Sequence, residues 1–242
     1  MIPSIGKRLE IVDEICKSLK EKLGNSIQSA TVYWSTLCED FCESSDYDFL
    51  LVLHSTEYED MEVLKEIKNE FKTKGIGVDF NVHNTKETPS SRKKLYRHNN
   101  RSIYFQKEIE LYGKIVIWST PFQTENYSLK ELRVEAIKVI NSILYQARKL
   151  LINRELSQEE RIRMMKFCIY VTLYALASKD IYPKTKEEAL VNFKNHFITD
   201  LDPLIFLEIK TLQTNSITDK QVKMAYNFIS HVDQMIYSLY GW

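Results

Sequence analysis

The stretch that most constrains this chain is residues 31–53, TVYWSTLCEDFCESSDYDFLLVL, in which two apolar runs flank a polar segment. This pattern predicts a strand, a loop and a second strand. Asp46 and Asp48 stand at the start of the second strand, just before the apolar run at residues 49–53. Because side chains alternate between the two faces of a strand, these two carboxylates point the same way. The pair therefore suits a shared divalent cation.

A third carboxylate occurs in a later apolar run. Asp79 lies in the middle of residues 76–82, IGVDFNV, which predict another strand. Three acids on adjacent strands can hold two Mg²⁺ ions, and these hard cations bridge and neutralise triphosphate oxygens. The alternative is that Asp46 belongs to a turn and that Asp48 is an edge-strand charge that blocks aggregation.

The spacing of these residues resembles the DNA polymerase β-type nucleotidyltransferase superfamily. The shared pattern is a serine in a loop after a strand, then a Ser-Asp-hydrophobic-Asp-hydrophobic motif that begins ten residues later, then a third aspartate on a later strand. The layout is similar to that of the small MNT enzymes and the kanamycin and lincosamide nucleotidyltransferases, which join this domain to a helical one. The resemblance places Ser35 at the loop serine of the family. It places Asp46 and Asp48 at the first two metal ligands and Asp79 at the third.

The chain departs from the family pattern at two glycine positions. The family has glycine immediately before the loop serine and again four residues after it, where this chain has Trp34 and Glu39. Glycine permits positive φ and lets backbone N–H groups come close to phosphate. Two interpretations stay open. Either the triphosphate is held differently, with the Trp34 indole packed on the nucleotide, or transfer is slow or lost.

Composition excludes several classes of protein. The 242 residues, of which 44% are hydrophobic, suffice for one large domain or two modest ones. Lys and Arg number 33, as do Asp and Glu, and a formal charge of zero argues against a general polyanion binder. Neither a signal peptide nor a membrane span of ~20 apolar residues is recognisable, so the sequence predicts a cytoplasmic protein. The scattered cysteines predict free thiols: Cys16, Cys38, Cys42 and Cys168.

Apolar periodicity predicts the order of elements in the first half of the chain. A helix from Ile5 ends near Gly24, and a second helix through residues 61–71 ends near Gly75. Residues 114–118, KIVIW, predict a further strand. The expected fold class is α+β. A nucleotidyltransferase domain at residues 1–122, with a mixed sheet and helices, precedes an all-α bundle.

The second half of the chain is helical in pattern. The polar residues 123–126 follow Pro121 and predict a linker, and residues 127–242 predict a bundle of about five helices. Ser128 and Glu131 predict a capping box at the start of the first of these helices. The bundle resembles the C-terminal domains of kanamycin-type transferases.

The resemblance also implies roles for individual residues. Asp46 and Asp48 would bind both Mg²⁺ ions, and Asp79 the ion that holds the acceptor oxygen. The general base in kanamycin-type enzymes is a glutamate of the helical domain, for which Glu131 and Glu135 are the candidates here. Their ordinary interpretation is a favourable interaction with the helix dipole, and Asp79 is an alternative base. The candidate contacts to the nucleoside triphosphate are Trp34, Ser35, Ser45, Arg97 and Arg101.

The sequence leaves three functions open. The first is an enzyme that moves a nucleoside monophosphate, with AMP from ATP as the leading candidate, onto a hydroxyl of a small molecule such as an aminoglycoside or lincosamide, and so confers antibiotic resistance. The second is an MNT-type transferase that acts on a partner protein or a tRNA end, docked through the basic residues 92–101. The third is a catalytically inactive binding or antitoxin module. A homodimer is expected from the superfamily, and the sequence does not determine the acceptor, the base preference or the oligomeric state.

Overall fold

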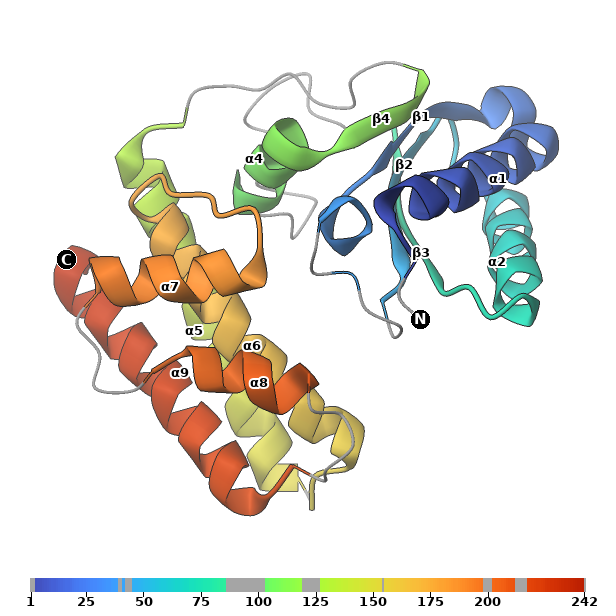
Figure 1. The fold of residues 1–242 in the computed structure, drawn as a ribbon. Coiled ribbons are helices and arrows are strands. Elements are labelled where there is room, and N and C mark those ends of the chain that lie inside the picture. The colour runs from blue at the N-terminus through green and yellow to red at the C-terminus, as the bar shows by residue number, and fades with distance from the viewer. Residues whose placement is uncertain are drawn as a thin grey trace. The chain divides into compact units, whose positions relative to one another are not determined.

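A computed structural model describes residues 3–38, 41, 45–85, 103–118, 127–153, 155–197, 202–211 and 217–241. The chain divides into two compact units (Figure 1). The sheet unit comprises Met1–Arg101 and Phe105–Glu125, and the helical unit comprises Ser102–Tyr104 and Asn126–Trp242. A mixed four-stranded sheet with helices precedes a helical region, which confirms the predicted α+β class.

The sheet has the strand order β3-β2-β1-β4. Its strands are β1 (Ile27–Val32), β2 (Tyr47–Leu53), β3 (Val78–Asn84) and β4 (Lys114–Trp118). β1 pairs antiparallel with both β2 and β4, whereas β2 pairs parallel with β3. A parallel pair needs a crossover, and helix α2 (Tyr58–Thr73) supplies it. The predicted strand, loop and strand at residues 31–53 are therefore present, as are the strand at 114–118 and the helix before β3.

Helices α1 (Ile5–Leu23) and α2 cover one face of the sheet (Figure 1). The Ser4 side chain caps α1 by accepting the Lys7 N–H, and Gly24 ends this helix at φ +51°. The helices bury their apolar stripes against odd-numbered residues of β2. This core includes Ile15, Leu19, Phe49, Leu51, Ile67 and Phe71.

The even-numbered residues of β2 point to the opposite face. There Leu50 packs with Tyr33 and with Ile109 of helix α4 (Ile103–Tyr112). Because side chains alternate along a strand, Asp48 shares this second face with Leu50. Asp48 therefore lies on the side of the sheet away from α1 and α2.

The helical unit contains five helices among the residues that the structure describes, which agrees with the prediction. They are α5 (Leu129–Asn153), α6 (Gln158–Ala177), α7 (Lys186–His196), α8 (Leu204–Thr211) and α9 (Asp219–Tyr240). α6 is buried on nearly every side and contacts the other four helices. Side-chain caps fix the start of several helices, including the predicted Ser128–Glu131 box of α5 and a Thr185 cap of α7.

Cys16, Cys38 and Cys168 are free thiols, as predicted, and Cys42 lies outside the described residues. The predicted linker at residues 123–126 also lies outside them, as does the basic segment that contains Arg97 and Arg101. Within the described ranges, no helix has the length and apolar character that crossing a bilayer requires.

Candidate functional site

Two of the predicted acids lie at the start of the central strand β2. Asp46 is exposed and directly precedes β2, and Asp48 is half-buried as its second residue. Tyr47, between them, is buried on the opposite face and packs edge to face against Phe41, with 5.1 Å between ring centroids. Burial raises the pKa of Tyr47, and Arg8 partly offsets this rise. The alternation leaves both carboxylates on the face away from α1 and α2.

The third acid lies next to them in the sheet. β2 and β3 run parallel in register, and Asp48 is the direct partner of Asp79. Partners in register direct their side chains to the same face. The backbone therefore places Asp46, Asp48 and Asp79 at the same end of two neighbouring strands.

Gly77 makes room for the first acid. The Tyr47 N–H donates a hydrogen bond of 2.8 Å to the Gly77 carbonyl, which brings Gly77 beside Asp46. A Cβ at position 77 would overlap Asp46 Oδ1 and would lie 3.2 Å from Asp46 Cγ. The Asp46 carboxylate thus occupies the space that a side chain at 77 would fill. Sequence reasoning missed this residue, whose only signal was a glycine directly before an acid-bearing strand.

The Asp79 side chain is engaged by a lysine. Its Oδ1 lies 3.1 Å from Lys68 Nζ of α2, and both side chains are about half exposed, at 56% and 52%. In the parts of the chain that the structure describes, no three His, Cys, Asp or Glu side chains form a group able to hold a metal ion. Asp48 and Asp79 share a backbone register, and a metal site formed by the three acids stays a prediction.

Three of the five predicted nucleotide-binding residues lie in segments next to the acid pair, and the other two, Arg97 and Arg101, lie outside the described residues. The 3₁₀ turn Trp34–Leu37 contains Trp34 and Ser35, and Ser45 directly precedes Asp46. Thr36, in the same turn, is buried, and its Oγ1 accepts the Asp48 N–H at 3.3 Å. This bond holds the turn against the first residues of β2.

The sheet face that bears Asp48 carries several polar side chains beside the buried Leu50 and Val52. On β3 the residue two positions after Asp79 is Asn81, whose Nδ2 donates to Tyr33 Oη at 3.4 Å. On β1 the hydroxyls of Ser29 and Thr31 are buried and have no hydrogen-bond partner among the described residues. Buried polar groups are uncommon where only packing is required. This face therefore differs from the apolar one that α1 and α2 cover.

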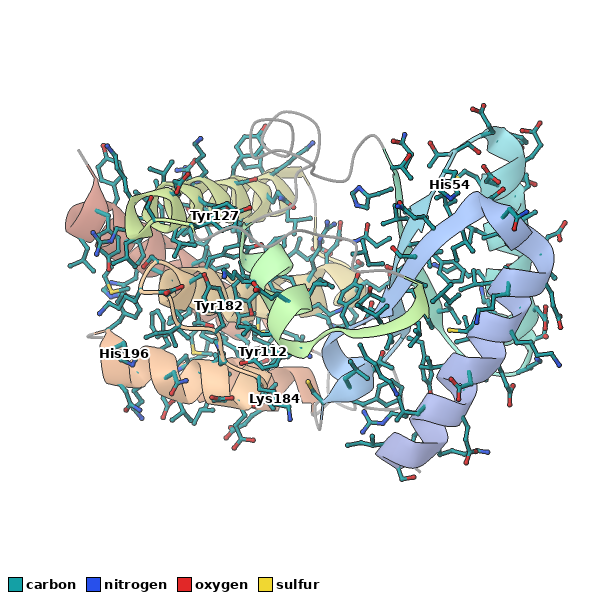
Figure 2. The ribbon with its side chains drawn as sticks, turned by 90° about the horizontal axis from the view of Figure 1, so that it is seen from above. His54, Tyr112, Tyr127, Tyr182, Lys184 and His196 are labelled. Carbon is teal, nitrogen blue, oxygen red and sulfur yellow. The ribbon has the colours of Figure 1, made fainter. Side chains whose placement is uncertain are left out.

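Histidines do not join the acids. His54 is exposed and follows the last residue of β2 (Figure 2), whereas Asp46 precedes the first. A strand of seven residues separates these ends by roughly 20 Å.

Glu131 has a structural partner in the helical unit. Its Oε2 accepts the N–H and the hydroxyl of Ser128, both at 2.8 Å, in the capping box of α5. Glu135, one turn further along α5, is half-buried. Glu131, one of the two glutamates predicted as a general base, thus accepts hydrogen bonds from the N-cap residue of α5.

Comparison with known proteins identifies a fold and no family. No family model matches the chain, and no curated protein matches its sequence. The structure is similar to the crystal structure of a spectinomycin adenyltransferase from Enterococcus faecialis determined with ATP and spectinomycin. The TM-score is 0.66 and the sequence identity 12%, over 93% of this chain and 99% of that one. At this identity the similarity shows the fold alone.

Proposed function

We propose that this chain is a metal-dependent nucleotidyltransferase that moves a nucleoside monophosphate, AMP from ATP, onto a hydroxyl of a small molecule such as an aminoglycoside or lincosamide antibiotic. The observation that supports the proposal is the register that pairs Asp48 with Asp79, with Asp46 two residues before Asp48. The fold adds support, because the similar E. faecialis enzyme was crystallised with ATP and spectinomycin. Spectinomycin is therefore the first acceptor to test.

The donor set fits magnesium in its chemistry and its backbone placement. Carboxylate oxygens are the ligands that Mg²⁺ prefers, and Gly77 leaves the Asp46 carboxylate the space it occupies. The Lys68–Asp79 pair is half exposed, and such pairs contribute only ~0–1 kcal/mol, so Asp79 is readily released to a bound ion. Asp46, Asp48 and Asp79 would hold two Mg²⁺ ions. When bound, the ions supply charge neutralisation at the phosphates and polarise the acceptor oxygen.

The protein itself would align the reactants and take a proton. The acceptor oxygen bonds to the α-phosphorus as the bond from that phosphorus to the pyrophosphate oxygen breaks, and the hydroxyl proton goes to a carboxylate. Glu135 or Asp79 would accept this proton, because Glu131 is occupied by the Ser128 cap. The proposed triphosphate contacts are Trp34, Ser35, Ser45, Arg97 and Arg101.

The test is transfer from radiolabelled ATP with Mg²⁺ to spectinomycin, other aminoglycosides and lincosamides. Asp46→Asn removes one charge and one ligand, and we expect a loss of more than about 100-fold in turnover, because even supporting residues around metal ligands cost 10–100-fold. Asp13→Asn is the matched control, since Asp13 is an exposed acid on α1. Wild-type turnover in Asp46→Asn would show that the acid pair does not bind the metal.

A second candidate is a nucleotide-binding module without transferase activity. The Lys68–Asp79 ion pair and the glycine-free turn at Trp34 favour it. Binding of ATP without release of pyrophosphate to any acceptor would support this candidate. Label on a protein or an RNA would instead support the MNT-type alternative. The cytoplasmic location and the homodimer stay predictions.

A further inference from the structure

A buried arginine contacts the loop beside the proposed triphosphate site. Arg8 is the fourth residue of α1, at the end of its first turn, and it is only 4% exposed. The Arg8 N–H donates to the Ser4 carbonyl at 2.9 Å, so the cap of α1 fixes the position from which the side chain extends. Burial of a guanidinium is costly unless the group is hydrogen-bonded. An apolar side chain at position 8 would cover the sheet without the desolvation cost of a guanidinium. The hydrogen-bond partners of Arg8 therefore indicate its role.

Those partners belong to the β1–β2 loop, defined as residues 33–46. Arg8 Nη1 donates to the carbonyl oxygen of Thr36 at 3.1 Å and to that of Cys38 at 2.7 Å. Its Cζ lies 4.9 Å from the centroid of the Phe41 ring, within range of a cation–π interaction. One buried side chain thus contacts three positions of the same loop.

The loop is connected in turn to the acid pair. Thr36 Oγ1 accepts the Asp48 N–H at 3.3 Å. Phe41 packs against Tyr47, the residue between Asp46 and Asp48. The contacts of Arg8 therefore reach the start of β2 by two routes, one through a hydrogen bond and one through ring packing.

The hydrogen bonds of Arg8 lie where a turn of the loop ends. The Thr36 and Cys38 carbonyls that Arg8 bonds lie at the C-terminal end of the 3₁₀ turn Trp34–Leu37, where carbonyl groups lack partners within the turn. The β1–β2 loop contains no glycine, so its backbone lacks the freedom that glycine gives. A contact from outside the loop, such as that of Arg8, can then hold the loop backbone in its conformation.

We propose that Arg8 is a positioning residue, which holds the 3₁₀ turn Trp34–Leu37 beside the start of β2 so that the turn can receive the triphosphate and Asp48 stays aligned. This inference rests on the proposed function, because the triphosphate is its object. The proposed action of Arg8 on the nucleotide is indirect and runs through the loop carbonyls and the aromatic ring that it contacts.

The test compares Arg8→Gln, Arg8→Lys and Leu19→Ala. Leu19 is fully buried on the same helix, three turns beyond Arg8, so Leu19→Ala destabilises the protein through a cavity in the core and removes no hydrogen bond to the loop. We expect Arg8→Gln to raise the equilibrium Kd for MgATP about tenfold or more, since two charge-assisted bonds are lost. Arg8→Lys, which keeps the charge, should recover part of the affinity. Hydrogen exchange at the Leu37 amide should accelerate in Arg8→Gln alone.

The outcomes separate the two proposals. All Kd values are measured by titration at a temperature where each variant is fully folded. A Kd in Arg8→Gln equal to that of wild type, or equal shifts in Arg8→Gln and Leu19→Ala, would overturn the role of Arg8 and leave the proposed function standing. If wild type binds MgATP without transferring AMP, the transferase proposal fails while the Arg8 comparison remains decisive. If wild type does not bind MgATP, both proposals fail.

Discussion

Gly77 and Lys68 act on the acidic residues from the neighbouring strand and helix. The absent side chain at Gly77 leaves space for the Asp46 carboxylate, and the Lys68 ammonium pairs with Asp79. Gly77 and Lys68 are not acidic, yet Gly77 leaves the position of the Asp46 carboxylate open and Lys68 binds the Asp79 carboxylate. At the scale of single residues, the proposed metal site therefore depends on the neighbours of Asp46 and Asp79 as much as on the acids.

Gly77→Ala tests the first of these effects. The added Cβ would overlap Asp46 Oδ1, so we expect the carboxylate to move and transfer to fall about tenfold or more, with a loss of about 1–3 kcal/mol in unfolding free energy from overpacking. Steady-state turnover and urea unfolding measure the two. Gly6→Ala is the control, since a Cβ at Gly6 meets only Ser4 Oγ at 3.9 Å. Unchanged turnover in Gly77→Ala would show that the position of the Asp46 carboxylate is not critical.

Cys16 gives the sheet unit a pH dependence. Burial raises its pKa from 9.0 to about 12. Below pH 9 both folded and unfolded chains keep the thiol proton, whereas between pH 9 and about 12 only the unfolded chain loses it. The free energy of unfolding should therefore fall by about 1.4 kcal/mol per pH unit from this group in that window. Cys16→Ser should remove that slope. Urea titrations at pH 8, 9.5 and 10.5 measure it, and parallel curves for the two proteins would contradict the assignment.

At the scale of elements, an arginine joins the first turns of two helices in the bundle. Arg161 of α6 donates from Nε to the Leu156 carbonyl at 3.1 Å and from Nη1 to the Ile217 carbonyl at 2.9 Å. Its Nη2 lies 2.6 Å from Asp219 Oδ1, the first residue of α9. The Arg161 side chain is 16% exposed and that of Asp219 is 90% exposed, so the carbonyl bonds lie in the more protected environment.

Arg161→Met should therefore destabilise the helical unit by about 1–3 kcal/mol, because two carbonyls lose a charged donor. Asp219→Asn, which removes only the exposed ion pair, should cost less than about 1 kcal/mol. Urea unfolding followed by helical circular dichroism measures both variants. Equal losses would place the stabilisation in the ion pair and not in the carbonyl bonds.

Helices were predictable because their signals are local. The Ser128–Glu131 box, the Thr185 cap and the apolar periodicity are each contained within a few turns of chain. The sequence predicted that Asp48 and Asp79 lie on adjacent strands, but it did not predict that they are direct partners. The parallel register depends on how α2 packs across the sheet. No sequence pattern indicates that Lys68 would lie beside Asp79.

At the scale of the whole molecule, two units each have their own hydrophobic core, and the pattern of apolar residues predicts both. The fold class follows from that pattern because strands and helices have different periods. Arg8 could not be identified from the sequence, since a charged residue on an amphipathic helix normally faces solvent. Its burial depends on a loop that lies about thirty residues further along the chain, as the hydrogen bond to Cys38 shows.

β2 has a neighbour on each edge, β1 on one side and β3 on the other. A one-residue shift of β2 against its neighbours would exchange the two sides of the strand, and it would turn Asp48 toward the α1 and α2 core and Phe49 toward the face that now bears Asp48. Such a change is barred by core packing alone, whatever the chemistry requires. Chains with a shifted β2 register would therefore fail to fold stably. The same packing that stabilises the sheet thus keeps Asp48 on its face, and only substitutions can change which side chains that face carries.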